Sequence, residues 1–259
     1  MATDTADPPA DPQPIPLTAD LRASIADRLA AHDRVELPLD GRRHAAVAIV
    51  VVDSEPGSDR TDPFGFDDEE MSVIPGYEPG KDDSLDGRMV DVSGGASFVL
   101  CRRSSRLNTH SAQWALPGGR IDEGETPIDA ALRETDEEVG VRFDESHVLG
   151  LLDDYATRSG YVMTPVVVWG GPDVRLVPSP DEVLAAYRVG FHQLTRPDSP
   201  RFVDIPESDR PVVQVPLGGD LIHAPTGAVL VQFRWLCLDG RPSDQTRVGD
   251  FEQPVFAWG

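Results

Sequence analysis

The sequence predicts an α/β fold, in which strands are the commonest predicted element and one helix carries a dense cluster of carboxylates. Three observations predict this class. Short apolar runs of strand length recur along the chain and are separated by turns rich in Gly, Pro and Asp. One segment, Pro127 to Val139, has helix signals at both ends. No run of about 18 apolar residues occurs, so no membrane-spanning segment is predicted.

The composition favours a small-molecule partner. The chain of 259 residues carries a net charge of −22, which repels nucleic acid and anionic membranes. The first residues lack the basic start and apolar centre of a secretion signal, so we expect a cytoplasmic protein. Cys101 and Cys237 lie in apolar, strand-like contexts, and we interpret them as buried free thiols.

The N-terminal part is expected to begin with a tail. Residues 1–20 are acidic and rich in proline, so we predict disorder there. Leu21, Ile25 and Leu29 then have helical spacing, which predicts a short amphipathic helix ending near His32. Residues 21–259 are expected to form one domain.

Two apolar runs, residues 45–52 and 97–102, predict neighbouring strands of one sheet. Residues 53–95 between them are acidic and rich in Gly, Pro and Ser, and we interpret this stretch as a flexible insertion loop. Further strands are predicted over residues 148–152, 161–169, 186–194, 212–215 and 229–238.

The helix over 127–139 is specified by its own sequence. Thr126 suits the N-cap and Pro127 the first helical position. Asp129, three residues after the cap, favours the positive end of the helix dipole. Gly140 is placed to end the helix.

Three carboxylates on this helix, Glu134, Glu137 and Glu138, are neighbours because they are one, three and four residues apart. Their mutual repulsion calls for a compensating charge, and a hard divalent cation such as Mg²⁺ or Mn²⁺ would supply it. Such a site fits metal-assisted attack of water on phosphorus. The predicted apolar face, which should pack against the sheet, consists of Ile128, Leu132, Thr135 and Val139.

The residues around the helix extend this hypothesis. Gly118 and Gly119 allow a tight loop whose backbone can approach a metal or a phosphate. Arg133 lies off the acidic face, where it could pair with Glu125 and hold the loop onto the helix. The alternative is a solvated acidic helix face, which is common in so acidic a chain and would be favoured if the three glutamates stood alone.

The complete pattern resembles the Nudix box, with Gly119, Glu125, the run Arg133 to Val141, and only Thr135 departing from the usual aliphatic residue. The resemblance implies an α/β/α sandwich around a mixed sheet. It also implies that a catalytic set of residues hydrolyses a diphosphate, with Mg²⁺ or Mn²⁺ as cofactor. The metal would be held by Glu134, Glu137, Glu138 and the Gly119 carbonyl. That catalytic set is Glu125, Arg133, Glu134, Glu137 and Glu138.

The segment before the box is similar to the signature of coenzyme A diphosphatases. In register are Arg103, Ser104, Leu107, His110, Gln113 and Pro117-Gly118-Gly119, whereas Cys101, Ala112, Trp114 and Leu116 depart. Later landmarks follow in the family's order: Ser159-Gly160-Tyr161, Asp181-Glu182-Val183, Phe251-Glu252-Gln253 and Trp258-Gly259. The resemblance implies a substrate-binding set of Arg103, Arg106, His110, Gln113 and Gly118.

The expected reaction is therefore cleavage of coenzyme A or an acyl-CoA to 3′,5′-ADP and (acyl) 4′-phosphopantetheine, by a monomer or homodimer. A diphosphatase acting on ADP-ribose, NADH or another nucleoside diphosphate is the nearest alternative, and a non-catalytic nucleotide sensor is a third.

Glu182 is a weak candidate for the general base. Arg102 could neutralise a phosphate or be a solvated strand end, and Trp114 could stack on a base but is interpreted as a core aromatic.

Overall fold

The computed structural model describes residues 12–60, 62, 89, 91–104, 113–218 and 220–255. Arg106 and His110, most of the predicted insertion loop, and the landmark Trp258-Gly259 lie outside the described residues.

A mixed central sheet is built around β1 (Arg43–Ser54). The strand order is β3-β2-β1-β7-β5, with β4 paired to β1, β6 to β7 and β8 to β2. The β1–β7 pair is parallel and the other pairs are antiparallel, so the predicted mixed sheet is confirmed. The remaining strands are β2 (Gly95–Arg103), β3 (Trp114–Ala115), β4 (Gly118–Arg120), β5 (Val148–Leu151), β6 (Tyr155–Ala156), β7 (Tyr161–Gly171) and β8 (Val183–Gly190).

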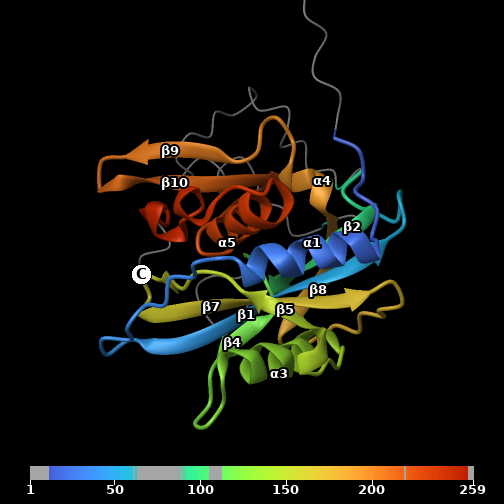
Figure 1. The fold of residues 1–259 in the computed structure, drawn as a ribbon, viewed down its shortest axis with the longest axis horizontal. Coiled ribbons are helices and arrows are strands. Elements are labelled where there is room, and N and C mark those ends of the chain that lie inside the picture. The colour runs from blue at the N-terminus through green and yellow to red at the C-terminus, as the bar shows by residue number, and fades with distance from the viewer. Residues whose placement is uncertain are drawn as a thin grey trace, which may run out of the picture.

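Helices cover both faces of this sheet (Figure 1). The helix α3 (Pro127–Val139) lies on one face, and α1 (Ala19–Ala30) and α5 (Thr226–Phe233) lie on the other. The predicted α/β/α sandwich is thus confirmed. A second sheet lies beyond α5 and has the order β11-β10-β9, with β9 (Arg201–Ile205), β10 (Ser208–Leu217) and β11 (Asp220–His223).

The central strands are apolar on both faces because both faces are covered. Ala46, Ala48 and Val50 of β1 pack with the apolar residues of α3. Ile49 and Val51, which point the other way, belong to the larger core cluster that also contains residues of α1 and α5. Among the described residues, no helix has the length and apolar character needed to cross a bilayer.

Two strand predictions need correction. Residues 229–238 form the end of α5 and a π-helical turn, Arg234–Leu238, where a strand was predicted. The run is buried nearly all round, so its apolar residues show no periodicity that separates a helix from a strand. The strand predicted over 186–194 is β8 only as far as Gly190, and Phe191–Leu194 form the short helix α4. Cys101 and Cys237 are buried free thiols, as predicted.

The predicted tail is too long. Thr18 caps α1, accepting a hydrogen bond from the amide of Leu21 at 3.1 Å, so the helix begins at Ala19. Ahead of the cap, the carbonyl of Ile15 accepts a 2.6 Å hydrogen bond from the amide of Ala96 in β2, and the side chain of Ile15 packs on the core. This contact provides the apolar burial that the composition of residues 1–20 did not suggest.

The described residues of the predicted insertion between β1 and β2 pack on the fold. Met89 and Val92 are buried in the core. The Asp59 carboxylate accepts hydrogen bonds from the amides of Asp91 and Ser93, at 2.9 and 2.7 Å. The insertion therefore contributes side chains to the folded protein at both of its ends.

Candidate metal centre

The helix α3 has the bounds and caps that the sequence predicts. Thr126 accepts a hydrogen bond from the Asp129 amide at 3.2 Å, and the Asp129 carboxylate accepts one from the Thr126 amide at 2.9 Å, forming a capping box. Gly140 ends the helix in the left-handed conformation, with φ of 68°. These caps fix where the carboxylates of the helix stand relative to the sheet.

The buried face of α3 agrees in part with the predicted apolar face, because Thr135 and Val139 are buried as predicted. Ala131, Thr135 and Glu138 are buried, whereas Ile128 and Leu132 are only partly buried at the edge of the contact. Ala130 and Ala131 are both fully buried in this contact. Thr135 is fully buried and its hydroxyl donates a 2.7 Å hydrogen bond to the carbonyl of Ala131, so its polar group is satisfied within the helix.

The loop before α3 depends on two glycines. A Cβ at residue 118 would stand 2.3 Å from the carbonyl oxygen of Ala46 in β1, and a Cβ at residue 119 would stand 2.1 Å from Oε1 of Glu134. The amide of Gly118 donates a 3.1 Å hydrogen bond to Oε2 of Glu138. The backbone of β4 thus lies directly against the carboxylates of α3, as the sequence predicts.

Three carboxylates meet at this point: Glu134, Glu138 and Glu182. Each offers one oxygen, and these oxygens all lie within 4.8 Å of one another. Within the described ranges this is the one group of three or more His, Cys, Asp or Glu residues that could hold a metal ion. Glu182 stands just before β8, and its carbonyl accepts a 2.9 Å hydrogen bond from the amide of Ser104.

Glu137, which the resemblance implies as a metal ligand, lies outside this group. Its side chain is half exposed and accepts a 2.9 Å hydrogen bond from Arg133. Glu182, by contrast, belongs to this group. No spacing links Glu182 to the box, and only the landmark Asp181-Glu182-Val183 singled it out.

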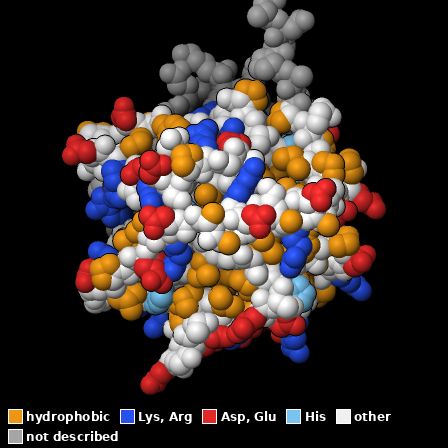
Figure 2. Space-filling view, viewed as in Figure 1, with side chains coloured by type: hydrophobic (Ala, Val, Ile, Leu, Met, Phe, Trp, Pro, Cys, Tyr) orange, Lys and Arg blue, Asp and Glu red, His pale blue; other side chains and the backbone are white. Residues whose placement is uncertain are grey.

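Burial disfavours the ionised form of two carboxyls in the cluster. Burial raises the pKa of Glu138 to about 7, with the charges of Glu134 and Glu182 adding to the rise and Arg103 and the Gly118 amide opposing it. Burial also raises the pKa of Glu134, although its contact with Arg133 works against this. Acidic side chains gather over α3 and the loop before it (Figure 2).

Arg133 joins the loop to the helix. Its Nε donates to Glu125 at 2.8 Å, so the predicted pair is confirmed. The same guanidinium donates to Glu134 at 2.8 Å, to Glu137 at 2.9 Å and to the carbonyl of Arg120 at 3.0 Å. Arg133 therefore holds the loop in place and draws Glu137 away from the other carboxylates.

Two of the substrate-binding candidates lie together at the end of β2. Arg103 is exposed there, and its amide donates a 3.2 Å hydrogen bond to the carbonyl of Gln113.

Arg102 points elsewhere: its side chain is fully buried, so the hypotheses of a phosphate contact or a solvated strand end are both wrong. Trp114 is 6% exposed and packs edge-on against Tyr187, which confirms a core aromatic.

The chemistry of the donor set fits a divalent cation. Mg²⁺ and Mn²⁺ prefer carboxylate and carbonyl oxygens, and the cluster offers three carboxylates beside the glycine loop. Glu138 is 7% exposed, and this burial disfavours its ionised form and raises the pKa of its carboxyl to about 7. A bound cation would favour the ionised carboxylate.

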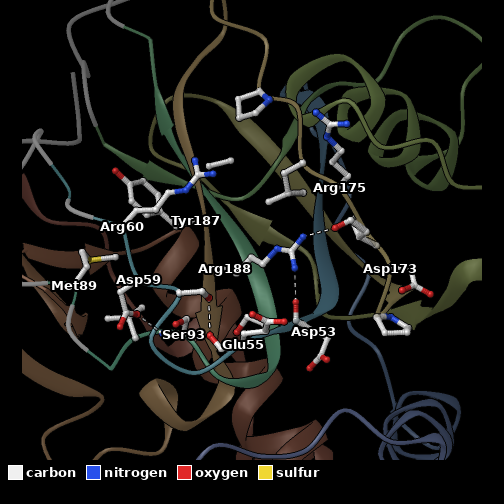
Figure 3. Close-up of a pocket in the computed structure, with 18 residues that line it drawn as sticks. Asp53, Glu55, Asp59, Arg60, Met89, Ser93, Asp173, Arg175, Tyr187 and Arg188 are labelled. Atoms are coloured by element: carbon white, nitrogen blue, oxygen red, sulfur yellow. Dashed lines mark hydrogen bonds between the residues drawn. The ribbon is translucent and has the colours of Figure 1, made fainter.

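A separate cavity of about 740 Å³ lies beside the end of β1 and the middle of β8 (Figure 3). Its lining mixes basic and acidic side chains, among them Arg60, Arg175 and Asp173. Arg188 spans it and donates to the carbonyls of Asp53, at 2.7 Å, and Val174. The lining includes none of the three carboxylates of the metal centre, so the two sites are distinct.

With the fold and the site described, their class can be stated. Residues 88–208 match the NUDIX domain, a stretch that contains the glycine loop, α3 and all three clustered glutamates. Residues 88–208 are therefore a Nudix domain, and the curated relatives of this stretch carry the name Nudix hydrolase.

Particular relatives share this part of the chain. The protein is 35% identical over 112 residues to "Nudix hydrolase 3" of Caenorhabditis elegans, covering 42% of this chain and 47% of that one. It is 40% identical over 97 residues to "Uncharacterized Nudix hydrolase NudL" of Escherichia coli, covering 37% of this chain and 50% of that one. The chain thus spans about half the length of these curated relatives. A MutT/nudix family protein from Enterococcus faecalis aligns over 88% of this chain and 78% of its own, with a TM-score of 0.47 and 15% identity.

Proposed function

We propose that this protein hydrolyses a diphosphate bond in a small nucleotide, with Mg²⁺ or Mn²⁺ as cofactor. The observation that carries the proposal is the convergence of Glu134, Glu138 and Glu182 within 4.8 Å beside the glycine loop. A solvated acidic helix face would expose its carboxylates and spread them apart. Here one carboxylate is buried and a third comes from a different part of the chain.

The roles of the residues follow from their positions. Glu134, Glu138 and Glu182, with the Gly119 carbonyl, would hold the cation, which when bound would neutralise charge on the phosphate oxygens and acidify a water molecule. Glu137 would join them only by leaving Arg133. Arg133 and Glu125 keep the loop against α3, so that the carboxylates stay in place when a charged substrate enters.

Arg103 is the phosphate contact that we propose from this chain. It is exposed at the end of β2, and its charge reaches Glu138, whose pKa it lowers against the larger effect of burial. A guanidinium at this position can donate two parallel hydrogen bonds to a phosphate. Gln113, whose carbonyl accepts from the Arg103 amide, and Gly118 complete the described part of the substrate-binding set.

For the substrate we propose coenzyme A or an acyl-CoA. The support is the order of the motifs before and after the box, together with the action of the Arg103 charge on Glu138. Water would attack one phosphorus of the diphosphate, and the bond from the bridging oxygen to that phosphorus would break. The products would be 3′,5′-ADP and (acyl) 4′-phosphopantetheine.

Incubation with coenzyme A and either Mg²⁺ or Mn²⁺, followed by chromatography of the products, tests the proposal. ADP-ribose and NADH are run in parallel. Glu138→Gln should abolish turnover, whereas Asp136→Asn is a matched control, because Asp136 lies on the same helix and pairs with exposed Arg142. Turnover of ADP-ribose without release of 3′,5′-ADP from coenzyme A would overturn the substrate. No turnover of any diphosphate with either metal would favour a nucleotide sensor.

A further inference from the structure

Arg102 is a fully buried cation next to Arg103 at the end of β2. Its guanidinium lies over the ring of Trp114, 3.6 Å from the centroid, within the core cluster on the α1 and α5 side of the sheet. One nitrogen donates to Asp220 at 2.7 Å, and two others donate to Asp62. A buried guanidinium is tolerated only when carboxylates compensate it, so both partners matter to the end of β2.

The two carboxylates come from different parts of the fold. Asp220 begins β11 in the second sheet, whereas Asp62 belongs to the insertion between β1 and β2. Their side chains are 2% and 6% exposed. The second oxygen of Asp62 accepts a 3.0 Å hydrogen bond from the hydroxyl of Tyr187 in β8. Asp62 therefore ties the insertion to β2 and β8 together.

Other described residues of the insertion pack on the same core. Asp59, Arg60, Met89 and Ser93 line one side of the cavity that Tyr187 also lines (Figure 3). Asp59 binds the backbone just ahead of β2, at the opposite end of that strand from Arg102. Asp59 thus holds the insertion's own backbone ahead of the start of β2, whereas Asp62 contacts Arg102 at the end of β2.

The pairing of β2 with β8 is irregular at the position that Asp62 holds. Arg102 is opposite Ala185, but Arg103 is opposite Val183, so β8 has a bulge at Leu184. Immediately beyond the bulge, the Ser104 amide donates to the carbonyl of Glu182 at 2.9 Å. The strand end that Asp62 holds from one face therefore presents Arg103 on the other face and places Glu182 beside it.

We propose that Asp62 is a positioning residue for the metal centre. By compensating Arg102 and binding Tyr187, it holds the bulged ends of β2 and β8 in register, and this register sets where Arg103 and Glu182 stand relative to Glu134 and Glu138. The insertion then has a part in the hydrolysis without touching the substrate. The link to hydrolysis rests on the proposed function.

Hydrogen exchange of the full chain tests the structural part without any substrate. In Asp62→Asn, amide exchange in residues 102–104 and 182–186 should accelerate by about tenfold or more, because opening of this strand end becomes easier. Asp59→Asn is the matched control, since it removes the same charge from the same insertion at the other end of β2. Tyr187→Phe is a milder second variant for the case that Asp62→Asn folds poorly. It deletes only the hydroxyl, so it should show a smaller acceleration of exchange. Exchange in Asp62→Asn and Tyr187→Phe equal to that of the unmodified chain would overturn the proposal.

A double-mutant cycle with Arg103→Gln tests the functional part. Asp62→Asn should lower kcat/KM by about 10- to 100-fold, the size of loss that small misplacements of reacting groups produce. In the Arg103→Gln background the same substitution should cost much less, because the two changes act through one group. Fully additive losses would show a purely structural role and reject positioning of Arg103. If the unmodified chain hydrolyses no diphosphate, the proposed function fails, while the exchange measurement still decides whether Asp62 holds the strand end.

Discussion

Glu134 lies so close to Gly119 that a Cβ at residue 119 would stand 2.1 Å from its Oε1 and 2.4 Å from its carboxyl carbon. A side chain at residue 119 would thus displace the Glu134 carboxylate of the candidate metal centre.

Replacing Gly119 by alanine should therefore displace Glu134 and weaken binding of Mn²⁺, by about tenfold or more in titration calorimetry. Gly249→Ala is the control, because nothing lies within 4 Å of a Cβ at that position. Both variants should unfold at nearly the temperature of the unmodified chain. An unchanged Mn²⁺ affinity in Gly119→Ala would show that Glu134 does not bind the metal.

Thr135→Val should be neutral or slightly stabilising. The hydroxyl of Thr135 is buried and its one partner in the structure is the carbonyl of Ala131, an oxygen that remains available to the helix backbone after the substitution. Replacement by an isosteric apolar residue should change the free energy of unfolding by less than about 1 kcal/mol. Denaturant unfolding measures this, and hydrolysis should be unaffected. A large loss of stability would mean that the hydroxyl has another buried role.

Metal binding should weaken as the pH falls, because the proton competes for Glu138. Burial raises the pKa of its carboxyl from 4.5 to about 7, so below pH 7 the folded, metal-free protein holds a proton there. The Mn²⁺ affinity should then fall by up to about tenfold for each further pH unit. Calorimetry between pH 8 and pH 5.5 measures this, and the slope should be much smaller in Glu138→Gln.

The raised pKa of Glu138 has the opposite effect on the stability of the metal-free protein, which should increase as the pH falls. A carboxyl whose pKa is higher in the folded state than in the unfolded state binds its proton more tightly when folded. Without metal, the contribution of Glu138 to the free energy of unfolding should therefore increase as the pH falls from about 7 towards 4.5. Saturating Mn²⁺ should abolish this increase near pH 7. If the metal-free protein and its Glu138→Gln variant showed the same change in the free energy of unfolding over this pH range, the burial argument would be contradicted.

Acid should destabilise the chain through Glu252. Burial opposes ionisation of this carboxyl, but hydrogen bonds from Arg158, the Gln253 amide, Arg210 and Ser208 outweigh it and lower the pKa to about 2. Its stabilising effect is complete above pH 4.5 and is lost as the pH falls towards 2. Glu252→Gln should lose about 2 kcal/mol at pH 7 and show a shallower loss below pH 4.5 in urea unfolding. Parallel pH profiles for the two proteins would refute this role.

The parts of the fold that local chemistry determines were the ones predictable from sequence. Thr126 and Gly140 bound α3 by signals that lie within a few residues of its ends, and both ends agree with the prediction. Residues 45–52 and 97–102 were predictable as strands because strands buried on both faces are continuously apolar.

The features that were missed depend on distant pairings. Glu182 reaches the cluster only through the register of β8 on β2, and no spacing along the chain encodes that register. Asp62 lies in a stretch whose composition indicates flexibility, and its buried partner Arg102 looked like a solvated strand end. Residues 229–238 lacked periodicity because α5 is enclosed by the protein on nearly every side.

The contrast between α3 and the bulge at Leu184 has a consequence for how the protein matures. Glu134 and Glu138 become neighbours as soon as their helix forms, whereas Glu182 joins them only after strands far apart in the chain have paired. A partly folded chain would offer two of the three carboxylates and hold a cation weakly. Tight cation binding would then appear last during refolding. It would distinguish fully folded molecules from those in which β8 has not yet paired with β2.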